Sequence, residues 1–369
     1  MFATLLRKSS KCIEIFSNFA QVNKIGHKGI RANMLLKLLH YVFAVSLLIG
    51  LTNVYAASCA ESPALATGIA KLYTTTFNQA FLLEGNGRSW RLQATGNQML
   101  LEPMDSPTQP PLPSADALPD ALVAQGSRNI RRAWLTQPTD RYPHGVLGDR
   151  IEAAGIRVEL ANGQQIDFQL GADAVFEDRY PRLTDLDGDG QDEIVVVKSY
   201  LDRGASIAVF GIRDGQLALL AETPPVGSPN RWLNPAGFPD LDGDGKLEIA
   251  VVITPHIGGT LQVYRYADGG LTPIWSLSGV SNHRLGSREL AMAAVTDLNK
   301  DGRHELIIPA DGRQIIYQIW LSQDGLKTWR IARHADPVDT ALLAGDFDSD
   351  GRIELLYGLA DGRLVFCSL

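Results

Sequence analysis

The stretch Asp185-Leu-Asp187-Gly-Asp189-Gly190-Gln-Asp-Glu193 places acidic side chains at positions 1, 3, 5 and 9 and a glycine at position 6. Carboxylate oxygens at this spacing can surround a hard cation such as Ca²⁺, which takes about six to eight oxygen ligands. The glycine permits the backbone conformation that so tight a turn requires. The stretch therefore predicts a calcium-binding loop.

The same pattern occurs three more times toward the C-terminus. We call the four copies the first to fourth acidic loops, at 185–193, 240–248, 297–305 and 346–354. The predicted ligands of up to four structural Ca²⁺ ions are Asp185, Asp187, Asp189, Glu193, Asp240, Asp242, Asp244, Glu248, Asp297, Asn299, Asp301, Glu305, Asp346, Asp348, Asp350 and Glu354. Asn299 is the one neutral ligand, and Lys300 and Arg303 lie beside it, so the third loop is expected to bind Ca²⁺ most weakly.

Short apolar segments flank each acidic loop. Runs such as Ile194–Val197 and Ile249–Ile253 follow the loops, and Thr340–Ala344 precedes the fourth. Aliphatic and β-branched runs of this length are typical of buried strands. An EF-hand loop instead continues to a bidentate Glu at its twelfth position and opens a helix, so that class of calcium site is disfavoured.

Each of the first three acidic loops is followed by two further apolar segments separated by a glycine turn. These turns, at 213–215, 268–270 and 323–325, carry an Asp-Gly dipeptide, which is a strong hairpin signal. The loops recur at intervals of 55, 57 and 49 residues. Four antiparallel strands in a repeat of this length are typical of a β-propeller blade. The sequence therefore predicts an all-β chain.

The predicted fold is a β-propeller of six blades, with seven as the alternative, and calcium loops lie between the first two strands of four blades. A fifth, degenerate blade is expected at 134–170, with 142–152 in the place of the calcium loop. Segments 81–87 and 90–92 are expected to belong to a sixth.

Set between two strands, the pattern Asp-x-Asp-x-Asp-Gly-x-x-Glu resembles the calcium loop of FG-GAP (VCBS-type) repeats. These repeats build the β-propellers of integrin α-chain heads and of many secreted bacterial proteins. The resemblance is clearest over residues 175–369, and segments 230–237, 254–260 and 281–289 also resemble secreted FG-GAP proteins of proteobacteria. It implies a propeller with structural Ca²⁺. It implies no particular activity, because such propellers serve adhesion, signalling and, fused to other domains, catalysis.

The N-terminal region predicts export. Residues 1–33 are expected to be an upstream extension rather than a domain, and residues 34–56 a signal peptide that ends at a small-residue cleavage site. The apolar run is shorter than the roughly 20 residues of a membrane span. A retained signal anchor is one alternative, and a lipoprotein anchored through Cys59 is another. The mature chain, 57–369, is expected to be a single periplasmic or extracellular domain without a transmembrane span, carrying a Pro-rich surface insertion at 103–126.

Charge and motifs narrow the function. The chain has a formal net charge of −7 and no run of Lys or Arg, which makes nucleic acid a poor partner. It contains no Gly-x-Ser-x-Gly, His-Glu-x-x-His, phosphate-loop or Cys-x-x-Cys motif. The prediction is accordingly a binding or scaffold module of the cell envelope with an unknown protein or glycan ligand, and the sequence leaves open whether any catalysis occurs. The sequence leaves the oligomeric state open.

Polar residues on the connections between blades form the candidate ligand site, because propeller function usually lies on such loops. They are His144, Arg203, Arg231, Asn234, His256, His283, Arg288 and Glu289. Together they suit an anionic or carbohydrate ligand. If His283 and Glu289 formed an acid–base pair, the chain would instead be a periplasmic hydrolase or lyase acting on an anionic glycan or phosphoester. The structural alternative is that these side chains cap backbone carbonyls, that Trp232 packs between blades, and that His304 is solvated.

Two cysteines, Cys59 and Cys367, lie near the two ends of the mature chain. Only three strands are evident in the last blade, and a strand at about Ile69–Tyr73 is expected to supply the fourth. A disulfide would then join the two ends in an oxidising compartment. The alternatives are two unpaired thiols or a lipidated Cys59.

Overall fold

The computed structural model describes residues 57–76, 79–95, 98–105 and 112–369. The predicted upstream extension, the predicted signal peptide and part of the predicted Pro-rich insertion lie outside these residues. Residues 56–369 make up one compact unit. The described part of the chain contains no helix with the length and apolarity of a membrane span.

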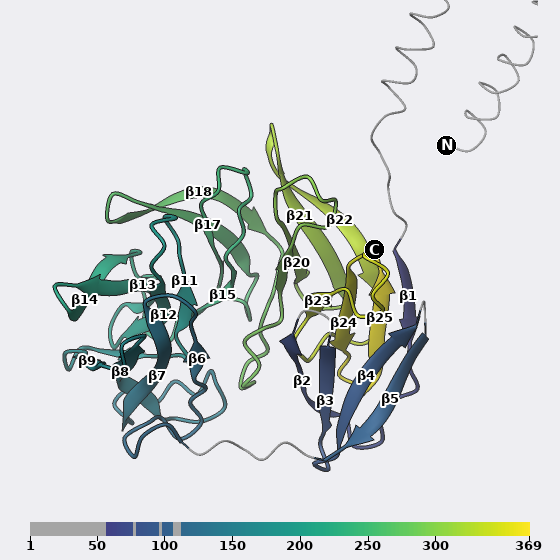
Figure 1. The fold of residues 1–369 in the computed structure, drawn as a ribbon, viewed down its shortest axis with the longest axis horizontal. Helices are drawn as coiled ribbons and strands as arrows, with labels where there is room; N and C mark the ends of the chain where they lie inside the picture. Colours follow the sequence, from purple (N-terminus) through teal and green to yellow (C-terminus); the bar gives the residue numbers. More distant parts are fainter. Residues whose placement is uncertain (1–56, 77–78, 96–97, 106–111) are drawn as a thin grey trace, which may run out of the picture. The chain divides into compact units, whose positions relative to one another are not determined.

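The described residues form strands and no helices, as the apolar segments predict (Figure 1). The strands are β1 Ser58–Glu61, β2 Ile69–Thr76, β3 Gln79–Glu84, β4 Ser89–Thr95, β5 Gln98–Met104, β6 Ala124–Gln125, β7 Ile130–Thr139, β8 Glu152–Leu160, β9 Gln165–Gln169, β10 Ala174–Phe176, β11 Arg182–Thr184, β12 Glu193–Tyr200, β13 Gly204–Arg213, β14 Gln216–Glu222, β15 Leu233–Gly237, β16 Ile249–Ile253, β17 Thr260–Ala267, β18 Gly270–Ser278, β19 Ala294–Thr296, β20 Glu305–Pro309, β21 Ile315–Ser322, β22 Gly325–Arg333, β23 Leu343–Gly345, β24 Glu354–Gly358 and β25 Leu364–Ser368.

The strands pair into antiparallel groups of four, which we call modules 1 to 6. Module 1 is β2–β5, module 2 is β6–β9, module 3 is β11–β14, module 4 is β15–β18, module 5 is β19–β22, and module 6 is β23–β25 together with β1. Modules 1, 4, 5 and 6 are separate four-stranded sheets. Modules 2 and 3 merge into one nine-stranded sheet, because the short strand β10 pairs with both β8 and β12.

From module 2 to module 6, successive modules lie side by side around a common centre, and module 1 lies beside module 6 (Figure 1). Module 3 contacts module 4 through β14 and β18, module 4 contacts module 5 through β18 and β22, and module 5 contacts module 6 through β19 and β23. Strand β2 of module 1 contacts β23 and β24 of module 6. The last module therefore packs against the first.

The core lies in the middle strands, as their uninterrupted apolar runs predict. In β12, Ile194–Val197 are all 0 % exposed, because neighbouring modules cover both faces of the strand. Phe210 of β13 is also fully buried and meets the rings of Phe168 and Phe176 edge-on, at 4.7 and 5.8 Å between centroids. The outer strand β14 instead alternates buried and exposed residues.

The Asp-Gly turns form as predicted. Asp214 and Gly215 join β13 to β14 with φ values of 52° and 74°, and Asp268 and Gly269 join β17 to β18 with 52° and 71°. A two-residue hairpin turn needs positive φ at both positions to match the twist of its strands.

Two expectations about the N-terminal half are wrong. Ile69–Tyr73 belongs to β2, where it pairs with β3 and buries Leu72 in the apolar cluster that module 1 shares with module 6. The fourth strand of module 6 is β1, which pairs with β25. The stretch 142–152 does not replace a calcium loop either, because it connects the second strand of module 2 to the third. The position equivalent to the acidic loops is the short turn 126–129, between β6 and β7.

The C-terminal part of the predicted insertion contributes to the core. Ala117 bridges to Thr136 of β7, and the side chains of Ala117 and Leu118 are 3 % and 2 % exposed. Leu118 packs in the apolar cluster that module 2 shares with module 3. The segment was predicted to lie on the surface because it is rich in Pro, Ser and Asp, and its few apolar residues were too scattered to indicate burial.

Candidate functional site

The four acidic loops occupy equivalent places, each joining the first strand of its module to the second in modules 3 to 6. In the first loop, Asp185 accepts hydrogen bonds from the backbone N–H groups of Gly188 and Gly190, at 2.8 and 3.0 Å. Glu193 accepts one from Leu186 N–H at 2.9 Å. The final Glu of the other three loops makes the same contact, at 3.0, 2.8 and 2.8 Å. The turn itself therefore holds the carboxylates in place.

Three of the loops bring carboxylates close enough to share a cation. The clusters are Asp185, Asp187 and Glu193; Asp240, Asp242 and Glu248; and Asp346, Asp348 and Glu354, and within each one the ligand oxygens lie within 4.8 Å of one another. In the third loop, the amide of Asn299 stands where the other loops have the second carboxylate.

The fourth acidic loop fits a cation best. Asp346 Oδ1 and Glu354 Oε1 are buried there without a hydrogen-bond partner among the described residues. Burial raises the pKa of Glu354 to about 7, as it does for Glu193 and Glu305. An ionised carboxylate in such a place needs a positive partner, and a divalent cation among these oxygens would provide one.

In the second and third loops, the Oε1 atom of the final Glu has a partner, unlike Glu354 Oε1 of the fourth loop. In the third loop, the Asn299 side-chain amide donates to Glu305 Oε1 at 3.1 Å. In the second loop, Arg265 Nη2 contacts Glu248 Oε1 at 2.7 Å and Asp242 Oδ2 at 2.5 Å. The four loops are therefore alike in backbone and unlike in the charge that faces their carboxylates.

Neighbouring acidic loops touch one another. Leu247 N–H of the second loop donates to Leu186 O of the first, at 3.3 Å. His304, expected to be solvated, instead bonds the second loop: its Nδ1 accepts from Asp240 N–H at 2.8 Å. Lys300 of the third loop donates to Gly351 O of the fourth at 2.7 Å. A cation in one loop would consequently stabilise contacts between modules.

The predicted ligand residues do not form a single site. His256 Nε2 donates to His283 Nδ1 at 2.7 Å, and His283 Nε2 donates to the Ser287 carbonyl at 2.9 Å. Both rings pack against Trp232, at 6.0 and 4.8 Å between centroids. Burial lowers the pKa of His256 to about 4 and that of His283 to about 3, so both rings are neutral at neutral pH. Both ring nitrogens of His283 are thus engaged, and an acid–base pair with Glu289 does not form.

His144 also connects modules. Its Nδ1 lies 2.6 Å from Glu177 Oε1, and Ser199 donates to the other oxygen of this fully buried carboxylate. Trp232 Nε1 donates to the Glu177 carbonyl at 3.0 Å, so the histidine chain continues from module 2 to module 5. Nearby, burial and the charge of Glu177 raise the pKa of Glu152 to about 10. These contacts agree with a structural role for the three histidines.

The remaining predicted residues lie apart. Asn234 is fully buried and donates to the carbonyls of Asn282 and Leu290, at 3.2 and 3.1 Å, which joins module 4 to module 5. Arg203 packs on the Tyr200 ring and is half exposed. Arg231 is exposed.

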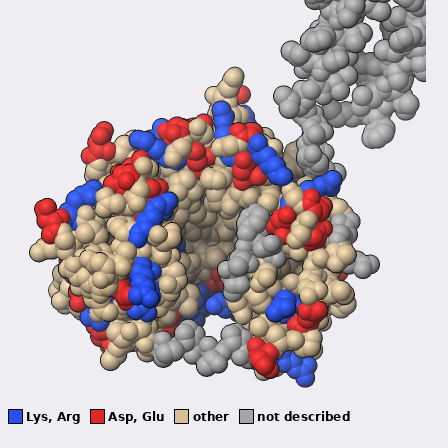
Figure 2. Space-filling view, in the orientation of Figure 1, with Lys and Arg blue, Asp and Glu red and all other residues tan. Residues whose placement is uncertain are grey.

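Arg288 and Glu289 line a cavity of about 730 Å³, together with residues of β2 and of the connections that precede β11, β19 and β23. The space-filling view of Figure 2 shows the hollow that the modules surround. Sequence reasoning missed three further cations of this cavity, which are Lys71, Arg179 and Arg284. Arg284 pairs with Asp339 at 2.6 Å, and Arg288 pairs with Asp149 at 2.9 Å. Only the packing of the modules brings these distant segments together, so no local pattern could have identified them.

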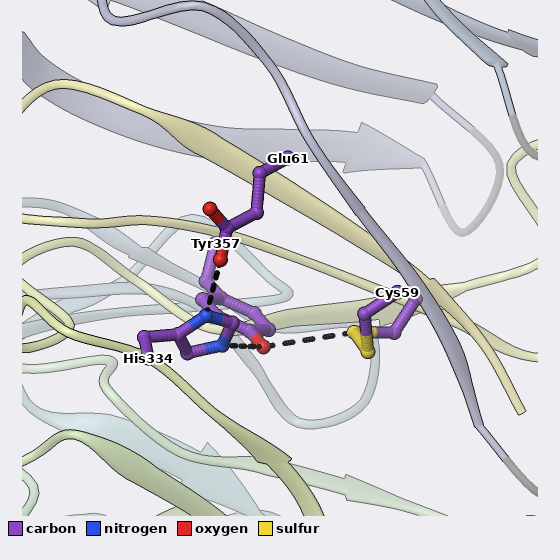
Figure 3. The surroundings of a disulfide bond; sticks show 5 residues. Cys59, Glu61, His334 and Tyr357 are labelled. Carbon is purple, nitrogen blue, oxygen red and sulfur yellow. Dashed lines mark hydrogen bonds and ion pairs between the residues drawn. A yellow bond between two sulfur atoms is a disulfide. The ribbon is translucent and has the colours of Figure 1, made fainter.

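Cys59 and Cys367 form a disulfide, with their Cα atoms 4.0 Å apart. They face each other across β1 and β25 (Figure 3). Around the bond, His334 bridges Glu61 Oε1 at 2.7 Å and the Tyr357 hydroxyl at 2.8 Å. Arg363 also contacts Glu61. The sequence offered no signal for His334, which lies in a connection yet is 7 % exposed.

Among solved structures, three rhamnogalacturonan lyases resemble this chain. YesW is 15 % identical, with a TM-score of 0.43, and the match covers 81 % of this chain and 66 % of the lyase. YesX is 16 % identical, with a TM-score of 0.41, and the match covers 82 % of this chain and 58 % of the lyase. The Bacillus licheniformis enzyme is 14 % identical, with a TM-score of 0.41, and the match covers 82 % of this chain and 60 % of the lyase. The chain thus spans less than two thirds of the length of these lyases.

Among curated proteins, none matches the sequence. A family model of the FG-GAP-like repeat matches residues 185–251 and 240–308. The two overlapping matches begin at the first residues of the first and second acidic loops and together include the third loop. These three loops and the strands around them are therefore FG-GAP-like repeats.

Proposed function

We propose that this chain is an exported, calcium-binding β-propeller of six blades that acts as a binding or scaffold module in the cell envelope. The six modules around a common centre would be the blades. The observation that carries the proposal is the fourth acidic loop, where buried oxygens of Asp346 and Glu354 lie without partners beside Asp348. Oxygen ligands of this kind suit Ca²⁺.

The proposed role of the ion is structural. Bound Ca²⁺ would neutralise carboxylates that the turns force together, and would fix the connection between the first and second strands of a module. The third loop would use the carbonyl oxygen of Asn299 in place of a carboxylate. Contacts between neighbouring loops, such as that of His304 with Asp240, would extend the stabilisation from one module to the next.

The cavity supports a binding role. Lys71, Arg179, Arg284 and Arg288 line it, against the acids Glu289 and Asp339. Lys71 is exposed and lies 5.2 Å from the Tyr73 ring centroid, an arrangement that leaves its ammonium open to an anionic ligand. An anionic glycan is the ligand class that this lining favours. The Cys59–Cys367 disulfide supports the exported location, since such bonds persist in oxidising compartments.

The test uses protein expressed from residue 57. Melting temperature is measured in EGTA and in 1 mM Ca²⁺, and then in Ca²⁺ with uronic-acid oligosaccharides or with neutral oligosaccharides of the same length. We expect Ca²⁺ to raise the melting temperature. Only the acidic oligosaccharides should raise it further, and Lys71→Ala should abolish this second shift. Lys327→Ala, which removes an exposed cation from β22, is the matched control.

An unchanged melting temperature in EGTA would overturn the calcium proposal. Equal shifts with acidic and neutral oligosaccharides, or a ligand shift that survives Lys71→Ala, would overturn the assignment of the cavity.

A further inference from the structure

The second acidic loop contains a positive charge of its own. A single guanidinium nitrogen, Arg265 Nη2, lies 2.5 Å from Asp242 Oδ2 and 2.7 Å from Glu248 Oε1. These carboxylates come from positions 3 and 9 of the loop, which are two of the three positions that would hold a cation in the fourth loop. The Arg265 nitrogen therefore occupies the space between the carboxylates.

The arginine is specific to this loop. In module 4, Tyr264 of β17 pairs with Ile249 of β16. Arg265 follows Tyr264 and Glu248 precedes Ile249, so Arg265 lies opposite Glu248. The same register in modules 3, 5 and 6 places Gly211, Trp320 and Ser368 at the equivalent position. None of these side chains carries a charge, so among the described residues only the second loop receives a cation from the third strand of its module. In the first loop, Arg128 of the turn 126–129 lies 3.7 Å from Asp185, at position 1, and pairs with Asp192 at 2.8 Å.

The surroundings hold Arg265 in place. Its guanidinium carbon lies 5.9 Å from the centroid of the Trp275 ring on the next strand. Glu248 is 0 % exposed, so its carboxylate depends on a positive partner within the protein. A Ca²⁺ ion at the same oxygens would meet an adjacent fixed positive charge and would have to displace it.

We propose that Arg265 is the resident cation of the second acidic loop, and that Ca²⁺ loads only the other loops. This inference rests on the proposed calcium function. The turn of module 4 would then keep its shape when Ca²⁺ is removed, whereas the turn of module 6 would lose its cation. Arg265 would set the number of ions that the chain binds.

The test counts bound Ca²⁺ by equilibrium dialysis of the protein from residue 57. Asp242→Asn in the second loop should leave the number unchanged, and Asp348→Asn at the same position of the fourth loop should lower it by one. Arg265→Gln should raise the number by one, whereas Arg265→Lys should not. Arg330→Gln, which removes an arginine from β22, is the matched control.

A spectroscopic readout locates the added ion. Tb³⁺ bound in the second loop would lie near Trp275, which would sensitise its emission. The Arg265→Gln variant should therefore show additional Tb³⁺ emission compared with the wild type. This additional emission should be absent from the double variant Arg265→Gln, Trp275→Phe. The single substitution Trp275→Phe should leave the emission of otherwise wild-type protein unchanged.

The inference is overturned if Asp242→Asn lowers the number of ions bound by the wild type, because the second loop would then be loaded despite Arg265. The Asp242→Asn and Asp348→Asn comparison is made in otherwise wild-type protein and does not depend on the folding of the Arg265 variants. If neither the wild type nor any variant binds Ca²⁺, the proposed calcium function fails as well. That result is distinguishable from loading of the second loop, in which the wild type does bind Ca²⁺.

Discussion

Breaking the bond between Cys59 and Cys367 should destabilise the whole described domain rather than its edge alone. Cys59→Ser is the cleaner substitution, because Cys59 is exposed whereas Cys367 is 0 % exposed. The two cysteines are 308 residues apart in the sequence. For a closed loop of this size, chain-entropy arithmetic gives a stabilisation of about 5–6 kcal/mol, and residual structure in the unfolded chain reduces it.

Burial contributes little to holding β1 in place. All four of its residues are exposed, so it buries almost no apolar surface, and its contacts include the ladder to β25 and the pairing of Glu61 with His334 and Arg363. Urea unfolding of protein from residue 57 measures the effect. With an m value of roughly 3–5 kcal/mol/M for a chain of this size, the midpoint should fall by about 1–2 M.

Reduction of the wild type with dithiothreitol should lower the midpoint to that of Cys59→Ser, and the variant itself should not respond to the reductant. A midpoint that is the same in oxidised wild type, reduced wild type and variant would refute the reasoning. It would mean that the ladder and the ion pairs suffice to hold the first strand on the last module.

Three further predictions concern ions, protons and packing. With Ca²⁺ at about one hundred times its Kd, a loaded site adds about 2.7 kcal/mol to the free energy of unfolding. Asp348→Asn should therefore lower the melting temperature in Ca²⁺, and lower it much less in EGTA. Equal losses in the two conditions would contradict the structural role of the ion. The pKa values of His256 and His283 are lowered to about 4 and about 3 in the folded protein. Below pH about 6.5 the unfolded chain therefore binds more protons than the folded one, and the free energy of unfolding should decrease as the pH drops from about 6.5 to about 4. His283→Gln should flatten the fall in urea midpoint between pH 6.5 and 4, and an unchanged slope would contradict this cause. Phe210→Ala should cost about 3–5 kcal/mol by urea unfolding, whereas Leu219→Ala, at a side chain 42 % exposed, should cost far less; similar losses would contradict the assigned core.

The sequence predicted the repeating parts well, because their signals are local. An acidic loop needs only nine consecutive residues, and an Asp-Gly turn such as 214–215 is specified by the φ values that those two residues tolerate. The uninterrupted apolar run of β12 likewise reports its own burial on both faces. These features required no knowledge of distant parts of the chain.

The errors occurred where the outcome depends on partners far away in the sequence. Ile69–Tyr73 has the composition of a closing strand, yet the closing strand is β1, whose exposed residues give no strand signal. The predicted ligand residues were grouped by residue type, and the fold distributes them between module contacts and the cavity. Arg265 was missed because its carboxylate partners lie in the acidic loop, 23 and 17 residues away in the sequence.

The pairing of β1 with β25 also has a consequence for the order of biosynthesis. Cys59 and Cys367 are the only cysteines in residues 57–369, so no incorrect intramolecular disulfide can form among them. At about 5–20 residues per second, the ribosome needs roughly 15–60 s to make the chain that separates them. Cys59 must remain a free thiol throughout this interval, and the first strand cannot pair until the last one has been made. The earliest part of the domain to emerge is thus the last to be fixed, and an oxidant that converts the Cys59 thiol to a sulfinic or sulfonic acid during that time would prevent the bond to Cys367 from forming.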